Sequence, residues 1–594
     1  MRKFRPTMVA GALALAFFAS SASAQFTNTY IFGDSLSDAG QYGARFTTNP
    51  GLVTPMYVGQ AFGLSSTPSF MGGNDFAQGG ARVNSQSPLI PSGAPNISIT
   101  QQVNAFLPNV ANNRDALYQI QGGANDIFVL AQTNPGGAQA GTTQAALDLA
   151  AAVGSLKAAG AQYVIVQNLP DLGKTPSAIG QGPASQAALS GLSGLFNSTL
   201  NTAIGNAGLQ VIQFNTNALF NEIIANPGLY GFTNVTNPAC TVASSVNCTP
   251  STLVSPDANL KYVFADGVHP STGATLLQAQ AIVSMITGPQ QVAALAEAPF
   301  DIERAQWRTL DSRMRSGIGT PGPTGKFQAW AAYDYANPDL FGPSLSGDAN
   351  LNTISVGGDM LVTDRMLAGL QFSYSEYKGD FGGNMGNFRV REPNLTAYVG
   401  YGQGPWYVGA TLGLGSLDFD NTRNIQLGAA TRSETGSGNG YHNIIRLLGG
   451  YWFNYKELNH GPFAKLTYEN IVVRQFSEAG SDSTSLTYDQ QSQDPIWSSL
   501  GYQATGMYSS FRPFARATWE YNFDGDTRTV SARPNTLNGT YTVPGFRQDD
   551  SWWLFDLGVS RDFGKVTGYI SGNVSAGKDD GDYWAITLGI RVPL

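Results

Sequence analysis

The stretch WYVGATLGLG, residues 406–415, decides the fold of the C-terminal half of this chain. Apolar residues occupy every second position, and tyrosine, threonine or glycine stands between them. Because successive side chains of a β-strand point to opposite faces, this strand has one apolar face and one polar or small face. The same alternation recurs at residues 368–375 and 584–593, and helical patterns stop after about residue 326. We therefore expect antiparallel β-structure over residues 326–594.

Two architectures fit this alternation: a transmembrane β-barrel with apolar residues facing lipid, and a soluble β-sandwich with an apolar core. Tyr401, Trp406, Trp552 and Trp553 lie near expected strand ends, where a membrane barrel carries its aromatic girdles. A closed barrel also leaves no unpaired strand edge in lipid. Beyond the N-terminal segment no run of about 18 apolar residues occurs, which excludes a helical span. These features favour the barrel.

The N-terminal half follows a different pattern, in which short β-rich runs alternate with helical ones. The β-rich runs lie at residues 30–32, 116–120, 163–166 and 211–214, and the helical patterns at 143–159, 184–207 and 272–286. Strands that are buried on both faces and separated by helices are typical of a parallel sheet covered on each side. We expect an α/β domain over residues 25–288.

Residues 1–24 have the layout of a secretory signal peptide. Lys3 and Arg5 precede a short apolar run, and Ala22 and Ala24 stand before the expected cleavage site. With 41 acidic and 33 basic residues the chain lacks the basic footprint of a nucleic-acid-binding protein. The charged fraction of 12% and the 70 glycines suit a β-rich exported protein.

The only two cysteines, Cys240 and Cys248, flank a short polar stretch that we expect to be a loop. Export permits a disulfide between them, which would be a local cross-link worth about 2–3 kcal/mol at most. Two free thiols are the alternative. A metal site would need further cysteine or histidine ligands nearby, so we predict no metal and no cofactor.

Residues 289–325 connect the halves and contain a predicted helix. Asp301 is expected to cap it, with Gly317 just past its end. The helix has a thin apolar stripe, and arginines at positions 304, 308, 313 and 315 spread charge around the rest. Such a helix suits the polar lumen of a barrel and equally suits an exposed position between domains.

Candidate catalytic residues follow from elimination and from position. Of the three histidines, His442 and His460 fall in the barrel half, so His269 is the one imidazole base available to the α/β domain. Asp266 stands three residues before it, close enough to orient its ring through one turn. Ser35 directly follows the first strand, at the edge of an open α/β sheet where catalytic groups gather. Taken singly, each fits an ordinary cap or surface residue as well.

Four sequence blocks, in order, resemble the GDSL (SGNH) hydrolase family. They are Gly33-Asp34-Ser35-Leu36, Asp75-Phe76-Ala77-Gln78-Gly79-Gly80-Ala81, Gly123-Ala124-Asn125-Asp126 and Asp266-Gly267-Val268-His269. The resemblance implies an α/β/α SGNH-hydrolase-like fold. It also implies that Ser35 is the nucleophile, His269 the general base and then acid, and Asp266 the orienting carboxylate. The oxyanion hole would comprise the N–H groups of Ser35 and Gly80 and the Asn125 amide, with Gly80 chosen over Gly79 by motif offset.

The barrel half resembles an autotransporter translocator, and the whole mature chain resembles the GDSL esterase autotransporters. This resemblance implies a twelve-stranded barrel threaded by the connecting helix, with the α/β passenger exposed on the surface of the bacterial outer membrane. The expected partners are an ester or lipid substrate, outer-membrane lipids and the barrel-assembly machinery, with the chain itself monomeric.

We thus expect a carboxylic ester hydrolase, an esterase or lipase, that acts through a Ser-His-Asp acyl-enzyme mechanism. One alternative is a surface adhesive or binding passenger that keeps a decayed hydrolase fold on the same barrel. A second is a pore in which the exported domain is a plug.

Overall fold

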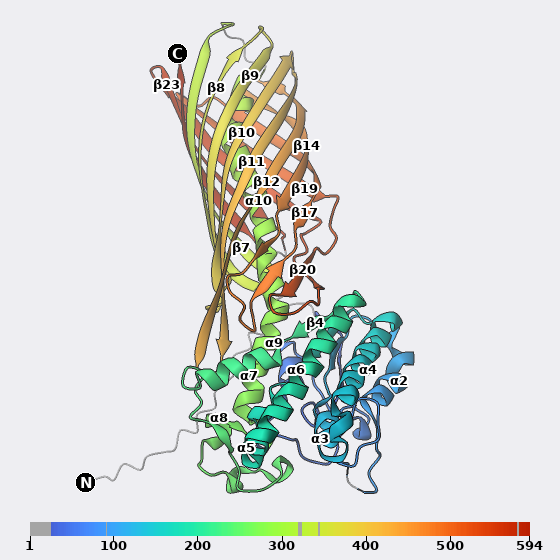
Figure 1. The fold of residues 1–594 in the computed structure, drawn as a ribbon. Coiled ribbons are helices and arrows are strands. Elements are labelled where there is room, and N and C mark those ends of the chain that lie inside the picture. The colour runs from blue at the N-terminus through green and yellow to red at the C-terminus, as the bar shows by residue number, and fades with distance from the viewer. Residues whose placement is uncertain (1–24, 91, 319–322, 343–344, 579–580) are drawn as a thin grey trace, which may run out of the picture.

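The computed structural model describes residues 25–90, 92–318, 323–342, 345–578 and 581–594. The predicted signal peptide lies outside these ranges. Figure 1 shows an α/β half at one end of a long β-barrel, with the C-terminus at the barrel's opposite end. Helix α10 (Ala294–Gly317) runs from the α/β half into the barrel.

A parallel sheet forms the centre of the α/β half. Its strands follow the order β1 (Thr29–Phe32), β2 (Leu117–Ile120), β3 (Tyr163–Gln167) and β4 (Ile212–Phe214). A separate parallel pair consists of β5 (Asn234–Pro238) and β6 (Tyr262–Phe264). All four central strands coincide with predicted ones, which confirms the parallel α/β architecture.

Helices cover both faces of this sheet. Successive strand residues point to opposite faces, so each strand contributes to two apolar cores. Leu117 and Ile165 join one apolar core, whereas Tyr118 and Val166 join the other. The α-helices are α1 (Thr54–Ala61), α2 (Ile99–Val110), α3 (Ala124–Thr133), α4 (Ala138–Ala159), α5 (Pro176–Gln181), α6 (Pro183–Asn206), α7 (Thr216–Ala225), α8 (Ala258–Lys261) and α9 (Thr272–Val292). The 3₁₀ turns are η1 (Ser69–Met71), η2 (Pro135–Gly137), η3 (Leu172–Lys174), η4 (Ser245–Asn247) and η5 (Pro250–Thr252).

Among the described residues, twelve antiparallel strands close into a barrel, as predicted. They are β7 (Phe327–Gly342), β8 (Leu345–Leu361), β9 (Met366–Asp380), β10 (Gly386–Gln403), β11 (Trp406–Leu427), β12 (Ala430–Tyr451), β14 (Leu458–Val473), β18 (Ile496–Gly506), β19 (Phe511–Asn522), β22 (Ser551–Phe563), β23 (Val566–Ala576) and β24 (Tyr583–Pro593). Pairing of β24 with β7 and of β12 with β14 completes the ring.

Short strands lie at the rim of the barrel that faces the α/β half. The strand β17 (Gln491–Gln493) pairs with β14 at this rim. The strand β13 (Phe453–Tyr455) pairs with the start of β14 at the opposite rim, beside the turn between β10 and β11. A small sheet combines β15 (Phe476–Ser477), β16 (Leu486–Tyr488), β20 (Thr529–Pro534) and β21 (Tyr541–Pro544). In Figure 1 β17 and β20 lie between the barrel wall and the α/β half.

The barrel wall is apolar outside and polar inside. On β9 the outward side chains of Leu370, Phe372 and Tyr374 are 55%, 49% and 43% exposed, whereas Gln371 and Ser373 between them are buried. A soluble sandwich would bury the apolar side chains and expose the polar ones. The observed exposure is the reverse and matches a barrel whose outer face meets lipid. No helix in the described ranges is both long and apolar enough to cross a membrane.

Tyr401, Trp406 and Trp553 are exposed, as a girdle requires, whereas the girdle prediction is wrong for Trp552. Trp552 is buried and lies under the Arg304 guanidinium, 5.0 Å from its ring centroid. The reason is the period of the strand: Trp552 and Trp553 are neighbours on β22, so they point to opposite faces.

Helix α10 occupies the barrel lumen, where its arginines meet acidic side chains of the wall. Arg308 donates two hydrogen bonds to Asp334, at 2.9 and 2.7 Å, and Arg313 Nε donates to Asp359 at 2.6 Å. These carboxylates are buried. The pairing of each buried charge explains how so polar a helix is enclosed.

The prediction that Asp301 caps this helix is wrong. Helix α9 ends at Val292, Ala293 keeps right-handed helical angles of φ −55° and ψ −31°, and α10 starts at Ala294. No cap is needed where one helix continues into the next. Asp301 lies within α10 and forms an ion pair with Arg304 at 3.0 Å.

The two halves also touch through the rim of the barrel. Arg432 on β12 donates to Glu222 Oε2 at 2.6 Å and to the Tyr230 hydroxyl at 2.7 Å. On the small rim sheet the Tyr541 hydroxyl donates to the Met285 carbonyl of α9. The α/β half is therefore bound to the barrel by more than the connecting helix.

Candidate active site

Ser35 lies in the turn that directly follows β1. The Asp34 carboxylate accepts the Leu36 N–H at 3.0 Å and a hydrogen bond from the Gln121 amide. The Gln102 side chain binds both the N–H and the carbonyl of Gly33, at 2.9 and 3.0 Å. These contacts fix the turn on both sides of Ser35, whose hydroxyl lies at the edge of the sheet.

His269 reaches Ser35 from a separate turn that follows β6. Its Nε2 lies 2.9 Å from Ser35 Oγ, and its Nδ1 lies 2.8 Å from Asp266 Oδ2. The N–H groups of Val268 and His269 both donate to Asp266 Oδ1, at 2.9 and 2.8 Å. The predicted residues Ser35, His269 and Asp266 thus form one continuous hydrogen-bonded chain.

The environment of Asp266 favours its ionised form. Burial alone would raise the pKa of this carboxyl, but the charge and hydrogen bond of His269 together with the two backbone donors hold it well below its usual range. A carboxylate that stays charged fixes the tautomer in which His269 Nε2 is free to accept a proton. That nitrogen is the one facing Ser35.

Gly80 and Asn125, which the resemblance predicts as oxyanion-hole residues, line the same cleft as Ser35. The Gly79 N–H donates to Asp38 Oδ2 at 2.8 Å, whereas the N–H groups of Gly80 and Ser35 have no acceptor among the described residues. The Asn125 amide donates one hydrogen to the Ala81 carbonyl at 2.9 Å, which leaves its second hydrogen available. Gly80, with φ +80°, has the left-handed backbone that glycine tolerates.

Buried carboxylates connect the segments of the first three blocks, and the sequence analysis assigned them no role. Asp38 accepts N–H groups of its own turn, from Gly40 and Gln41, and joins that turn to Gly79 of the second block. Asp126 beside Asn125 accepts from the Arg82 side chain at 3.0 Å and the Val83 N–H at 2.9 Å. Burial raises the pKa of both carboxyl groups. The contacts with Gly79, Arg82 and Val83 join residues that are distant in sequence, so no local pattern indicates them.

A cleft of about 850 Å³ opens over Ser35 and His269. Its lining includes the proposed oxyanion residues Gly80 and Asn125, and also Pro170 and Asp171 of the turn after β3. Apolar side chains form much of its wall; among them are Leu36, Phe46, Phe128, Leu189, Phe220 and Ile224. Among the described residues no group of histidine, cysteine or acidic side chains is arranged to hold a metal ion.

Comparison with known protein families accounts for both halves of the chain. Residues 30–282 match the GDSL-like lipase/acylhydrolase family, and residues 330–592 match the autotransporter β-domain. The chain is 30% identical over 573 residues to a Pseudomonas putida protein described as an uncharacterized protein in the trpE-trpG intergenic region, covering 89% of this chain and 94% of that one. The chain belongs to the GDSL esterase autotransporters.

Two further relatives of this GDSL autotransporter carry enzyme names. Esterase EstA of Pseudomonas aeruginosa is 28% identical, with 94% of each chain covered. Lipase 1 of Photorhabdus luminescens is 25% identical, with 98% of each chain covered. The GDSL autotransporter is therefore an ester-hydrolysing enzyme of the outer membrane whose passenger is displayed outside the cell.

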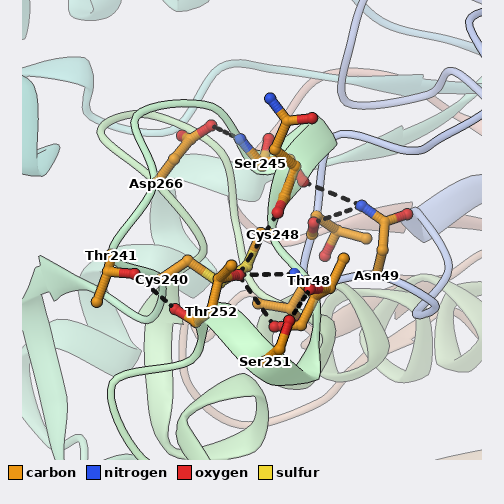
Figure 2. Close-up of a disulfide and its surroundings, with 12 residues drawn as sticks. Thr48, Asn49, Cys240, Thr241, Ser245, Cys248, Ser251, Thr252 and Asp266 are labelled. Carbon is orange, nitrogen blue, oxygen red and sulfur yellow. Dashed lines mark hydrogen bonds between the residues drawn. A yellow bond between two sulfur atoms is a disulfide. The ribbon is translucent and has the colours of Figure 1, made fainter.

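One residue of the GDSL passenger that sequence reasoning missed, Ser245, contacts both Asp266 and His269. The structure joins Cys240 and Cys248 in a disulfide, and Ser245 lies between them (Figure 2). The Ser245 N–H donates to Asp266 Oδ2 at 2.7 Å, and Ser245 Oγ lies 3.2 Å from His269 Nδ1. Nothing in the sequence around Ser245 indicates that it reaches Asp266.

Proposed function

We propose that this autotransporter hydrolyses carboxylic esters through a Ser-His-Asp acyl-enzyme mechanism. The observation that carries the proposal is the chain from Ser35 through His269 to Asp266, with contacts of 2.9 and 2.8 Å, which opens into the cleft. A nucleophile, a base within hydrogen-bond reach and a group that orients the base are the components that acyl transfer needs.

In the first step Ser35 Oγ attacks the ester carbonyl while His269 Nε2 takes the hydroxyl proton. The Ser35–acyl bond forms, the tetrahedral intermediate collapses, and the alcohol leaves with the proton from His269. Water, deprotonated by His269, then attacks the acyl-enzyme and releases the acid and free Ser35. Asp266 keeps its negative charge throughout and stabilises the imidazolium.

We propose the N–H groups of Ser35 and Gly80 and the Asn125 amide as the oxyanion hole. The commitment of the Gly79 N–H to Asp38 supports Gly80 as the donor. Fixed donors of this kind each contribute about 3–4 kcal/mol to stabilising the transition state.

The substrate class follows from the cleft. Its apolar wall beside Ser35 suits the acyl chain of an ester, as in the esterase and lipase that the relatives' names describe. All proposed catalytic groups come from one chain, which supports a monomer as the working unit. We also propose that the barrel-assembly machinery inserts the barrel.

The proposed division of the chain is a signal peptide at residues 1–24, the esterase at 25–288, a connecting segment at 289–325 and the barrel at 326–594. The family matches at 30–282 and 330–592 support the two larger units. The position of α10 in the lumen supports the connecting segment.

The test compares intact cells that display wild-type chain, Ser35→Ala or Ser37→Ala, using nitrophenyl esters of increasing acyl length. Ser37 lies in the same turn and, in the described part of the chain, forms no hydrogen bond with His269, so it controls for serine removal. We expect hydrolysis by wild type and Ser37→Ala and none above background by Ser35→Ala. Equal rates for wild type and Ser35→Ala would overturn the proposal and favour the adhesive passenger.

A further inference from the structure

The loop closed by the disulfide is anchored to the turn that carries Asp266. Cys240 and Cys248 are buried and pack against Ala265, the residue before Asp266. The Cys240 N–H donates to the Ala265 carbonyl at 3.2 Å. Figure 2 shows the disulfide beneath the segment that carries Ser245 toward Asp266.

A second anchor fixes the far end of the same loop. Asn49 donates from its side chain to the Ser245 carbonyl at 3.0 Å, and from its backbone to the Cys248 carbonyl at 2.9 Å. Both contacts bind the loop to a segment that is almost 200 residues away in sequence. Ser245 itself is fully buried. The loop is therefore held at both ends, with the disulfide joining the two.

The contact between Ser245 and Asp266 bears on the proposed catalytic chain. Asp266 Oδ1 is held by its own turn, through the N–H groups of Val268 and His269. Asp266 Oδ2, the oxygen closer to His269 Nδ1, takes its backbone donor from Ser245, at 2.7 Å. The Ser245 N–H thus fixes the rotation of the carboxylate, and with it the direction from which His269 is held.

We propose that the Cys240–Cys248 disulfide holds the Ser245 N–H against Asp266, so that Ser245 is a positioning residue and ester hydrolysis depends on the oxidised cysteine pair. The inference rests on the proposed roles of Ser35, His269 and Asp266. Without the cross-link the loop gains conformations in which the N–H no longer meets the carboxylate. The catalytic base is then less well oriented, while the cleft remains able to bind the ester.

Two substitutions at one position separate the backbone donor from the hydroxyl. Ser245→Ala keeps the N–H and removes Oγ, whereas Ser245→Pro removes both. Proline fits the site because Ser245 is the first residue of η4 and Ser244 before it is extended, with φ −124° and ψ 132°. We expect kcat to fall about 10- to 100-fold in Ser245→Pro, the range for losing a hydrogen bond to a charged group, with KM little changed. Ser245→Ala loses only the Oγ contact with His269 Nδ1, so its kcat should fall less than that of Ser245→Pro.

The disulfide is tested in the full chain in detergent with a phosphine reductant, which cleaves the S–S bond, takes oxygen from one water and leaves two thiols. Because the chain has only two cysteines, the reductant has no other target in it. We expect kcat to fall about tenfold as thiols appear and to recover on reoxidation. The Cys240→Ser/Cys248→Ser variant should show the lowered kcat from the start and no response to reductant.

The results distinguish this inference from the proposed mechanism. Wild-type kcat in both Ser245→Pro and the double cysteine variant, with Ser35→Ala inactive, would overturn the inference and leave the mechanism standing. A change confined to KM would also overturn it, because Ser244, Val246 and Asn247 line the cleft and would then act as its wall. If Ser245→Pro fails to fold by circular dichroism, the double cysteine variant decides. An active Ser35→Ala variant would overturn both the proposed mechanism and this inference.

Discussion

Asp34, the neighbour of the proposed nucleophile, should make the stability of the esterase half depend on pH. Burial raises the pKa of its carboxyl from 3.8 to about 6, against the hydrogen bonds from Gln121 and Leu36 that lower it. At about 1.4 kcal/mol for each pKa unit, this difference corresponds to roughly 3 kcal/mol. Between these two values the folded chain binds more protons than the unfolded chain, so the free energy of unfolding falls as pH rises. The destabilisation is absent below pH 3.8 and complete above pH 6.

Asp34→Asn removes this titration. We expect the free energy of unfolding of the variant, relative to wild type, to rise by about 2.5 kcal/mol between pH 4 and pH 8. The new amide has its own cost, because Asp34 Oδ2 has no partner among the described residues, but that cost does not vary with pH. Comparing how the free energy of unfolding changes with pH in the two proteins therefore isolates the contribution of the Asp34 carboxyl.

The measurement is urea unfolding of the full chain in detergent, followed by circular dichroism at 222 nm, since the helices lie mostly in the α/β half. Ser37→Ala, which removes no ionisable group, should give a curve parallel to wild type. Parallel curves for wild type and Asp34→Asn would refute the reasoning, because burial would then leave the Asp34 carboxyl unaffected.

Two further predictions concern the oxyanion hole and the lumen. Asn125→Ala should lower kcat for nitrophenyl esters about 100- to 1,000-fold with little change in KM, and a loss confined to KM would argue against its role. Arg313→Ala leaves Asp359 buried without its cation and should destabilise the barrel by about 3–5 kcal/mol, measured as a lower temperature for the heat-induced gel shift. The Arg313→Ala/Asp359→Ala variant should recover most of that loss; no recovery would argue against an unpaired charge as the cause.

Strict periodicity and rare residue types made much of this protein predictable. The period-two pattern predicted the barrel. In a membrane barrel, successive strand residues alternately face the lipid, which favours apolar side chains, and the lumen, which favours polar ones. The scarcity of histidine led to His269 before any family resemblance was used. The inference that His269 lies beside Ser35, more than 200 residues away in the sequence, depended on the order of the four blocks.

The errors have equally specific causes. Trp552 was placed at the lipid interface together with Trp553, although adjacent residues of one strand cannot share a face. Asp301 looked like a helix cap because a cap is a local pattern, whereas the actual continuity from α9 to α10 depends on Ala293. The contact from Ser245 to Asp266 depends on a folded loop, and no spacing in the sequence expresses it.

The near-continuity of α9 and α10 also restricts how the enzyme moves. From Thr272 to Gly317 the helical path is about 70 Å long at roughly 1.5 Å for each residue. One end is part of the esterase core, the other is ion-paired inside the barrel, and the rim contact of Arg432 with Glu222 prevents free rotation about this axis. These three attachments restrict rotation of the esterase relative to the barrel, so we expect the cleft to keep a nearly fixed orientation above the membrane. We therefore expect the enzyme to act on esters that diffuse to the space beside the barrel mouth.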